Sequence, residues 1–269
     1  MIERTEGYLE RDGERIWYES AGAGPVLVLS HGLGGNAAVW FQQLPYFAQT
    51  YRVITWDQRG FGRSSSQSGR LGPQPAVDDL LALLDHLEVK QAALVGQSMG
   101  GWVSMGAALR DPGRITTAVL ACSTAGIPLA AEPAADSGVV RSQVGARPLG
   151  VHPAIGERLA ERDPARAYLY QALGSFGHRP GDGEFARMLH DMTFGLPELA
   201  ALETPVLMLC GELDQMMTPA RIQHAATRLR HVTVHEFAGR GHSVYFEDPD
   251  AWNATVGAFL DEHYLSGTA

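Results

Sequence analysis

The chain contains 269 residues, of which 45% are hydrophobic, and its formal net charge is -9 at pH 7. This size and apolar content fit one large α/β domain with a substantial core. An acidic chain without a Lys/Arg-rich run lacks the positive field that phosphate contacts need, so we expect no nucleic-acid partner.

The first twenty residues carry a charged side chain every few positions, which is unlike a signal or transit peptide. No segment reaches the roughly 18 uninterrupted apolar residues of a membrane span. We therefore expect a cytoplasmic protein with no membrane partner. The two cysteines, Cys122 and Cys210, lie in separate apolar runs and give neither a disulfide framework nor a metal-ligand spacing, so we predict no metal site.

The first predicted element is a β-hairpin within residues 8–20. Two half-apolar runs flank Asp12 and Gly13, and Asp-Gly is a strong signal for a two-residue hairpin turn. We therefore expect an antiparallel edge on the sheet.

Six short apolar runs follow the hairpin, without the alternation of apolar and polar residues that marks a half-exposed strand. Such runs are typical of parallel strands covered on both faces. Residues 75–89 lie between two of the runs and predict an amphipathic crossover helix. The apolar face of that helix holds Val77, Leu80, Leu81, Leu84 and Leu87, and the six runs are residues 26–30, 52–57, 92–97, 117–123, 205–211 and 232–237.

A long segment separates the fourth and fifth of these runs. Connections between a helix and a strand usually take about 2–6 residues, far fewer than are present here. Pro and Gly breaks divide the segment into helical pieces, such as residues 154–176. We predict an inserted helical cap over 126–198, which splits the core into 1–125 and 199–269.

A serine between glycines follows the run at 92–97. Residues 96–100 read Gly-Gln-Ser-Met-Gly, the G-x-S-x-G pattern, directly after a predicted strand and before a predicted helix. A nucleophile at such a sharp turn needs small neighbours, and the helix N-terminus favours negative charge in front of it. We identify Ser98 as the candidate nucleophile. The alternative is an ordinary turn in which small residues relieve crowding.

A serine nucleophile needs a base, and the chain has ten histidines. We select His242, because it follows the last predicted strand and so lies in a loop at the same sheet end as Ser98. The others are interpreted as packed or surface residues, and a substrate contact stays open for those in the predicted cap, which are His152, His178 and His190.

The base in turn needs a carboxylate to orient it. Both Glu212 and Asp214 lie in the loop after the run at 205–211. Asp214 is our candidate, with Glu212 as the fallback, because a carboxylate three residues beyond the strand can turn toward a histidine in the next strand-end loop. Asp57 also ends a strand, but Arg59 and Arg63 nearby favour a structural ion pair. The order serine, acid, histidine is the order expected of α/β-hydrolases.

An oxyanion hole requires backbone amides that face the same point. Residues 29–36 end a strand with a Gly-rich turn, and we predict that the Leu33 and Met99 amides form the pair. Phosphate binding is the weaker interpretation of this loop, because neither a P-loop nor a dinucleotide fingerprint is present.

Together these motifs resemble the α/β-hydrolase superfamily over nearly the whole chain outside the predicted cap. The resemblance implies an eight-stranded, mostly parallel sheet with helices on both faces, a triad of Ser98, Asp214 and His242, and no cofactor. It rests on HGLGG at 31–35, DQRGFGRS at 57–64, GQSMGG at 96–101, GELD at 211–214 and GRGHS at 239–243.

The resemblance implies a hydrolase of a small-molecule carboxylic ester or lactone. Carbon–carbon bond hydrolases of aromatic degradation and cofactor-free haloperoxidases or perhydrolases are alternatives of the same family, and a small-molecule receptor is an alternative from another class. Candidate pocket residues are Trp40, Trp102 and Val244, each of which could instead pack in the core. Whether the chain forms a homo-oligomer is left open by the sequence.

Overall fold

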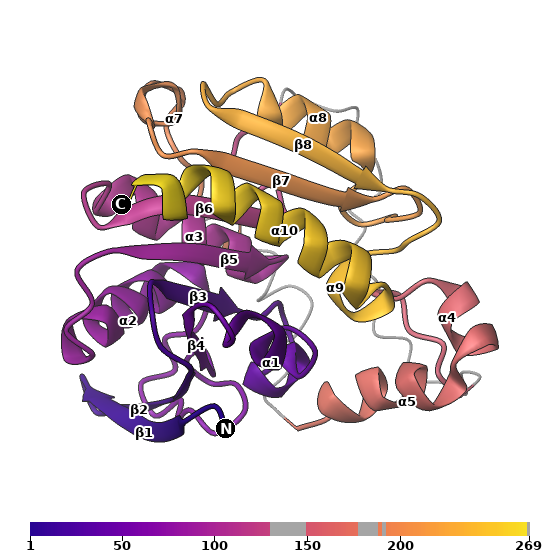
Figure 1. Ribbon diagram of the computed structural model, residues 1–269, viewed down its shortest axis with the longest axis horizontal. Helices are drawn as coiled ribbons and strands as arrows, with labels where there is room; N and C mark the ends of the chain where they lie inside the picture. Colours follow the sequence, from indigo (N-terminus) through magenta and orange to yellow (C-terminus); the bar gives the residue numbers. More distant parts are fainter. Residues whose placement is uncertain (130–148, 177–187, 190–191, 268–269) are drawn as a thin grey trace.

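A computed structural model describes residues 1–129, 149–176, 188–189 and 192–267. One sheet with the strand order β1-β2-β4-β3-β5-β6-β7-β8 runs through the molecule (Figure 1). The eight-stranded, mostly parallel sheet implied by the resemblance is therefore confirmed. The strands are β1 (Arg4–Arg11), β2 (Glu14–Ala21), β3 (Val26–Ser30), β4 (Arg52–Trp56), β5 (Ala92–Gln97), β6 (Ile115–Ala121), β7 (Val206–Gly211) and β8 (Val232–Phe237).

Helices cover both faces of this sheet, and α10 crosses the face nearest the viewer in Figure 1. The described helices are η1 (Ala37–Trp40), α1 (Leu44–Phe47), α2 (Pro73–His86), α3 (Met99–Arg110), α4 (Glu157–Arg162), α5 (Pro164–Leu173), α7 (Leu196–Ala201), α8 (Pro219–Ala226), α9 (Val244–Glu247), α10 (Pro249–His263) and η2 (Leu265–Gly267). Among the described residues, no helix is both long and apolar enough to cross a membrane.

The predicted hairpin is confirmed as β1 and β2, which pair antiparallel from Arg4 to Ala21. Asp12 and Gly13 form the turn with φ of 50° and 78°, the left-handed geometry that a twisted two-residue hairpin requires. Because β2 also pairs antiparallel with β4, the hairpin becomes one edge of the sheet.

The core is divided by the sheet into two layers. Successive strand residues face opposite sides, so Leu94 of β5 belongs to the core layer that includes residues of α2, α3 and α8, whereas Val95 belongs to the layer that includes residues of α10. Both residues are fully buried. This two-sided burial explains why the runs of inner strands such as β5 show no alternation in the sequence. The expectation of two covered faces is wrong for β8, an edge strand in which Thr233, His235 and Glu236 are exposed.

The end of β6 differs from the prediction. The apolar run predicts a strand over 117–123, but β6 spans Ile115–Ala121. Cys122 has φ of 49° and so leaves the extended conformation. Side-chain hydrophobicity continues beyond the point where the backbone turns, which is why the run overshoots the strand.

The helix predicted over 75–89 is α2, which begins earlier, at Pro73. It fully buries Asp79, a residue that the helical pattern places off the apolar face. Arg59 donates to both carboxylate oxygens of Asp79, over 2.6 and 2.9 Å. Of the ion pair expected between Asp57 and its two neighbouring arginines, only Arg63 contacts Asp57, at 3.0 Å.

Three described helices, α4, α5 and α7, lie in the chain between β6 and β7. Helices α4 and α5 stand beside the sheet, at the right of Figure 1. Residues 130–148, 177–187 and 190–191 of the predicted cap lie outside the described residues, as do His178 and His190. The domain division at 126–198 stays a prediction.

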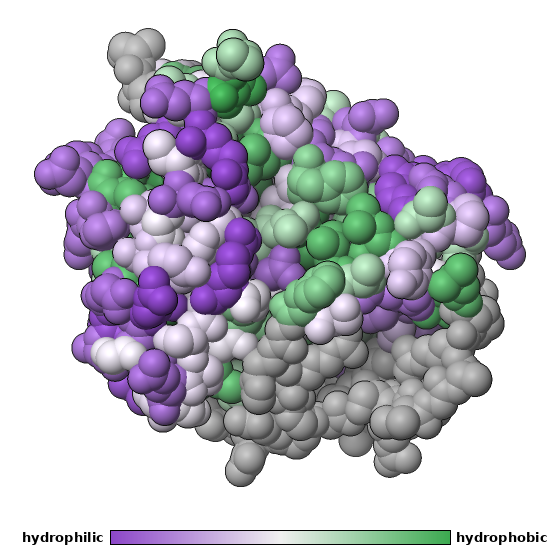
Figure 2. Space-filling model, turned by 90° about the horizontal axis from the view of Figure 1, so that it is seen from below, coloured by the Kyte–Doolittle hydropathy of each residue, from purple (hydrophilic) through white to green (hydrophobic). Residues whose placement is uncertain are grey.

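The side of the molecule seen from below carries both kinds of surface. Hydrophilic side chains dominate the left of this view, and hydrophobic ones gather toward its centre and right (Figure 2). Helix α5 contributes few residues to the core, since Ala167 is its one described buried residue, and its Tyr168 is 53% exposed.

Candidate active site

Ser98 stands at the turn between β5 and α3, with φ of 50° and ψ of -117°. A positive φ is rare outside glycine and costs conformational energy, so the surrounding structure must hold it. The Ser98 amide donates to the Ala121 carbonyl on β6 over 2.8 Å, and the Ser98 carbonyl accepts from Gly101 over 2.9 Å. The serine side chain is partly exposed.

The glycines on either side of Ser98 are required by close backbone approach. A Cβ on Gly96 would collide with the Gly100 carbonyl, and one on Gly100 would collide with the Ser30 carbonyl on β3. Backbone atoms cannot rotate out of the way as a side chain can. The small residues that the motif shows are therefore a steric condition for this turn.

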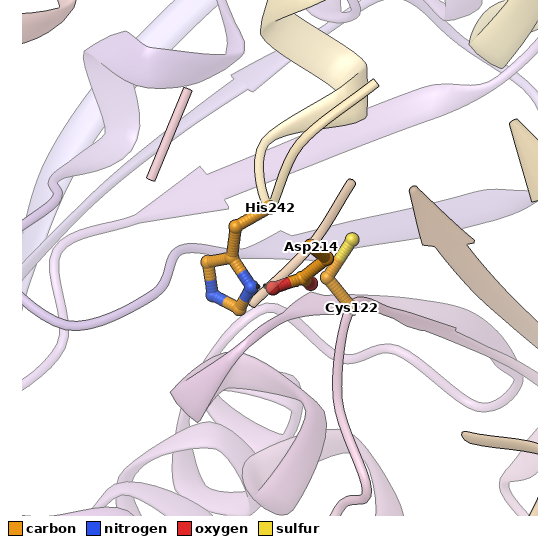
Figure 3. A group of neighbouring side chains, drawn as sticks. All are labelled: Cys122, Asp214 and His242. Atoms are coloured by element: carbon orange, nitrogen blue, oxygen red, sulfur yellow. Dashed lines mark hydrogen bonds and ion pairs between the residues drawn. The ribbon is translucent and has the colours of Figure 1, made fainter. Parts of the chain in front are cut away.

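His242 and Asp214 meet at the carboxyl edge of the sheet (Figure 3). His242 Nδ1 lies 2.7 Å from Asp214 Oδ2, and the two residues are 5% and 3% exposed. Because a carboxylate can only accept, Nδ1 carries the proton that it donates to Asp214. Nε2 is then the nitrogen that can accept a proton.

The Asp214 carboxylate is held in its ionised form. Its Oδ1 accepts from the amides of Met216 and Met217 over 2.8 and 2.9 Å. Burial raises its pKa, but the electrostatic interaction with His242 and the hydrogen bonds from His242, Met217 and Met216 outweigh burial and bring the pKa of Asp214 below its usual value. An ionised carboxylate next to His242 can stabilise the imidazolium.

Three loops converge around Ser98. A Cβ on Gly32, in the loop after β3, would lie 3.1 Å from the Ser98 Cβ, so this loop packs against the serine. Gln97, the last residue of β5, donates from Nε2 to the His242 carbonyl over 3.3 Å, which joins the end of β5 to the loop after β8. Among the described residues, no hydrogen bond joins Ser98 Oγ to His242.

The two predicted oxyanion donors come from the loop after β3 and from the start of α3. Leu33 is the second residue of a turn that the Gly35 amide closes on the Gly32 carbonyl over 3.1 Å. Met99 is the first residue of α3, where amides lack a partner within the helix. Their role as a donor pair stays a prediction.

His31 supports the Leu33 loop. It is fully buried, its Nδ1 lies 2.7 Å from the Gly32 carbonyl, and its Nε2 accepts from the Gln58 amide over 3.0 Å. Burial lowers the pKa of His31, which keeps the ring neutral. Both ring nitrogens are thus engaged with backbone.

Glu212, the alternative acid, is engaged elsewhere. It is exposed, and its Oε2 accepts from the Gly239 amide over 2.7 Å. Of the two carboxylates in this loop, Asp214 is therefore the one that contacts His242.

The three candidate pocket residues are buried. Trp40 is fully covered and packs on Tyr245 with ring centroids 4.6 Å apart. Trp102 and Val244 are 5% and 2% exposed and belong to the two core layers. Substrate contact by these residues stays a prediction.

One described cavity, of about 230 Å³, lies between α2, α3 and residues 192–198. None of the candidate site residues contributes to it. Its lining consists of Gln74, Gly106, Leu109, Arg110, Met192, Phe194 and Glu198.

Sequence reasoning missed that Cys122 lies beside the candidate acid. Its sulfur, Asp214 and His242 have potential ligand atoms within 4.8 Å of one another (Figure 3). Two ligands on a tetrahedral zinc ion are roughly 3.3 Å apart. Asp214 and His242 are at hydrogen-bond distance instead, 2.7 Å, and burial raises the pKa of the Cys122 thiol well above its usual value. The group therefore suits a hydrogen-bonded pair better than a metal.

Comparison with known proteins decides the family. A family model described as "Alpha/beta hydrolase family" matches residues 27–255, most of the chain. The chain belongs to the alpha/beta hydrolase family. The resemblance drawn from the motifs is thereby confirmed, and the protein is an enzyme of the hydrolase class.

This hydrolase is similar to several named proteins. It is 31% identical to 3-oxoadipate enol-lactonase 2 of Acinetobacter baylyi, with 88% of each chain covered. It is also 31% identical to a putative carbamate hydrolase of Stutzerimonas stutzeri, over 85% of this chain and 89% of that one. The structure of the enol-lactonase from Burkholderia xenovorans superposes with a TM-score of 0.78 and 26% identity, covering 95% of this chain and all of that one.

Proposed function

We propose that this hydrolase cleaves a small carboxylic ester or lactone through an acyl-enzyme on Ser98. The observation that carries the proposal is the His242 to Asp214 hydrogen bond of 2.7 Å in the loops that meet the Ser98 turn. An oriented histidine beside a strained serine is the arrangement that activates a hydroxyl as a nucleophile.

The reaction follows from the chemistry of these groups. His242 Nε2 takes the proton of Ser98 Oγ as the oxygen attacks the substrate carbonyl, and Asp214 stabilises the imidazolium. The Leu33 and Met99 amides bind the oxyanion, each contributing about 3 kcal/mol to the transition state. His242 then protonates the leaving alkoxide, and a water activated by His242 releases the acid from Ser98.

A lactone is the preferred form of the ester. The support comes from two similar proteins that carry the name enol-lactonase, one by sequence and one by structure. In a lactone the leaving alcohol stays attached to the acyl group, so one product leaves after deacylation. We expect a small ring with a carbonyl that reaches Ser98, and no cofactor.

The test measures kcat and KM for three substrates: an enol-lactone, a short p-nitrophenyl ester and an aryl carbamate. Wild type is expected to hydrolyse the lactone with the highest kcat/KM. Ser98→Ala should lose about 10⁴-fold or more in kcat, because the nucleophile and its base act as a unit.

Ser104→Ala is the matched control. Ser104 is a buried serine of α3 whose Oγ has no hydrogen-bond partner among the described residues. Its removal should leave kcat within twofold. Full lactone and ester turnover by Ser98→Ala would reject the serine mechanism. Covalent labelling of wild-type Ser98 by a fluorophosphonate without turnover of any substrate would favour a small-molecule receptor.

A further inference from the structure

Helix α5 contacts the loop that carries the candidate base. The Tyr170 hydroxyl lies 2.8 Å from the Ser243 hydroxyl, and Ser243 directly follows His242. Ser243 is fully buried. The contact spans 73 residues of sequence, so it joins the segment between β6 and β7 to the loop after β8.

The ring of Tyr170 is fixed by packing as well. It meets Phe246 of α9 edge to face, with centroids 4.9 Å apart, and His152 in the same manner at 5.1 Å. Burial raises the pKa of the neighbouring Tyr245 well above its usual value, and Tyr170 and Ser243 also act on that pKa. The Tyr170 hydroxyl is therefore held against Ser243, the residue next to His242.

The residue on the other side of His242 is held by the same region of the fold. The Glu247 carboxylate accepts from the Gly241 amide over 3.0 and 3.2 Å. The same carboxylate packs against Gly156, the residue that precedes α4, since a Cβ on Gly156 would lie 3.0 Å from Glu247 Oε2. The loop is thus anchored to the α4 and α5 segment immediately before and immediately after the histidine.

We propose that Tyr170 is a positioning residue for His242, acting through the Ser243 hydroxyl. This inference rests on the proposed function, because it assigns Tyr170 a part in holding the base of that reaction. The Ser243 hydroxyl fixes the backbone from which the imidazole extends. A misplacement of about 1 Å in a reacting group can cost 100-fold in rate, so loss of one anchor has a measurable cost.

The experiment measures the rate at which a fluorophosphonate labels Ser98 at saturating reagent, together with its apparent KI. Tyr170→Phe should slow labelling about tenfold and change KI by less than twofold, because the reagent pocket is intact and the base is misplaced. Tyr168→Phe is the matched control, since Tyr168 lies on the exposed side of the same helix. It should label at the wild-type rate.

A second variant separates positioning from loss of structure. Ser243→Ala should slow labelling to a similar degree, and the double variant should be no slower than either single one, because both remove the same contact. Melting temperatures are recorded so that all rates are compared on folded protein.

The outcomes separate this inference from the proposed function. Equal labelling rates of wild type and Tyr170→Phe, or a double variant whose loss is the product of the two single losses, would overturn the inference alone. A lower melting temperature with an unchanged rate would mark Tyr170 as structural only. A wild type that is not labelled at Ser98 would remove the proposed function and this inference with it.

Discussion

At the scale of single residues, the sequence favours Asp214 as the acid but keeps Glu212 as an alternative. Glu212 and Asp214 lie in the same loop and have the same charge. The choice depends on which carboxylate the folded loop turns toward His242. The Gly239 amide donates to the Glu212 carboxylate, whereas the Asp214 carboxylate contacts His242. Long-range contacts of this kind leave no mark on a local pattern.

Asp214→Asn should lower kcat for ester and lactone hydrolysis by about 10⁴-fold. The amide keeps the shape of the carboxylate but favours the wrong tautomer of His242 and cannot stabilise its charged form. Steady-state kinetics on the preferred substrate, with circular dichroism to confirm folding, would measure the loss.

Glu212→Gln serves as the control for this experiment. It lies two residues away and keeps an oxygen for the Gly239 amide, so kcat should stay within about twofold. A large loss in Glu212→Gln with little effect of Asp214→Asn would transfer the role of the acid to Glu212.

Other residue contacts could not be found from the sequence at all. Tyr170 and Ser243 carry no motif of their own, and their contact depends on how α5 packs on the loop after β8. Asp79 likewise has the position of a surface residue in the helical pattern, but it is fully buried. The two hydrogen bonds from Arg59 offset the cost of burying its carboxylate.

At the scale of elements, strands were predictable because two-sided burial leaves uninterrupted apolar runs. The runs at 26–30 and 92–97 coincide with β3 and β5, whereas β8, at the edge of the sheet, is half exposed. The end of β6 was not predictable, because a positive φ at Cys122 ends the strand inside an apolar run. Turns were predictable where their chemistry is local, as in the hairpin at Asp12 and Gly13.

Gly13→Ala should lower the free energy of unfolding by about 1 kcal/mol, since its φ of 78° disfavours a side chain. No described heavy atom lies within 4 Å of a Cβ at this position, so the cost is one of backbone conformation and not of collision. Urea unfolding followed by circular dichroism would measure it.

Gly113→Ala is the matched substitution for the hairpin glycine. A Cβ there is equally unobstructed by the described residues, but its φ is not in the left-handed region. Its free energy of unfolding should stay within about 0.5 kcal/mol of wild type. Equal losses at both glycines would contradict the conformational explanation.

At the scale of the whole molecule, chain order and topology together position the site. Strands β3, β5, β6, β7 and β8 run parallel, so the loops after them meet at one edge of the sheet. This is why Ser98, Asp214 and His242, which are distant in sequence, could be selected from their positions directly after apolar runs. The placement of α4 and α5 could not be predicted, because the apolar pattern of a helix does not identify the element against which that helix packs.

The measurement that tests the central claim most directly is the location of a covalent adduct. After treatment with a fluorophosphonate, peptide mass spectrometry should find one phosphonyl group on Ser98 in wild type and in Ser104→Ala, and no adduct in Ser98→Ala. An adduct on another residue, or labelling of Ser98→Ala at the wild-type rate, would contradict the assignment of Ser98 as the nucleophile.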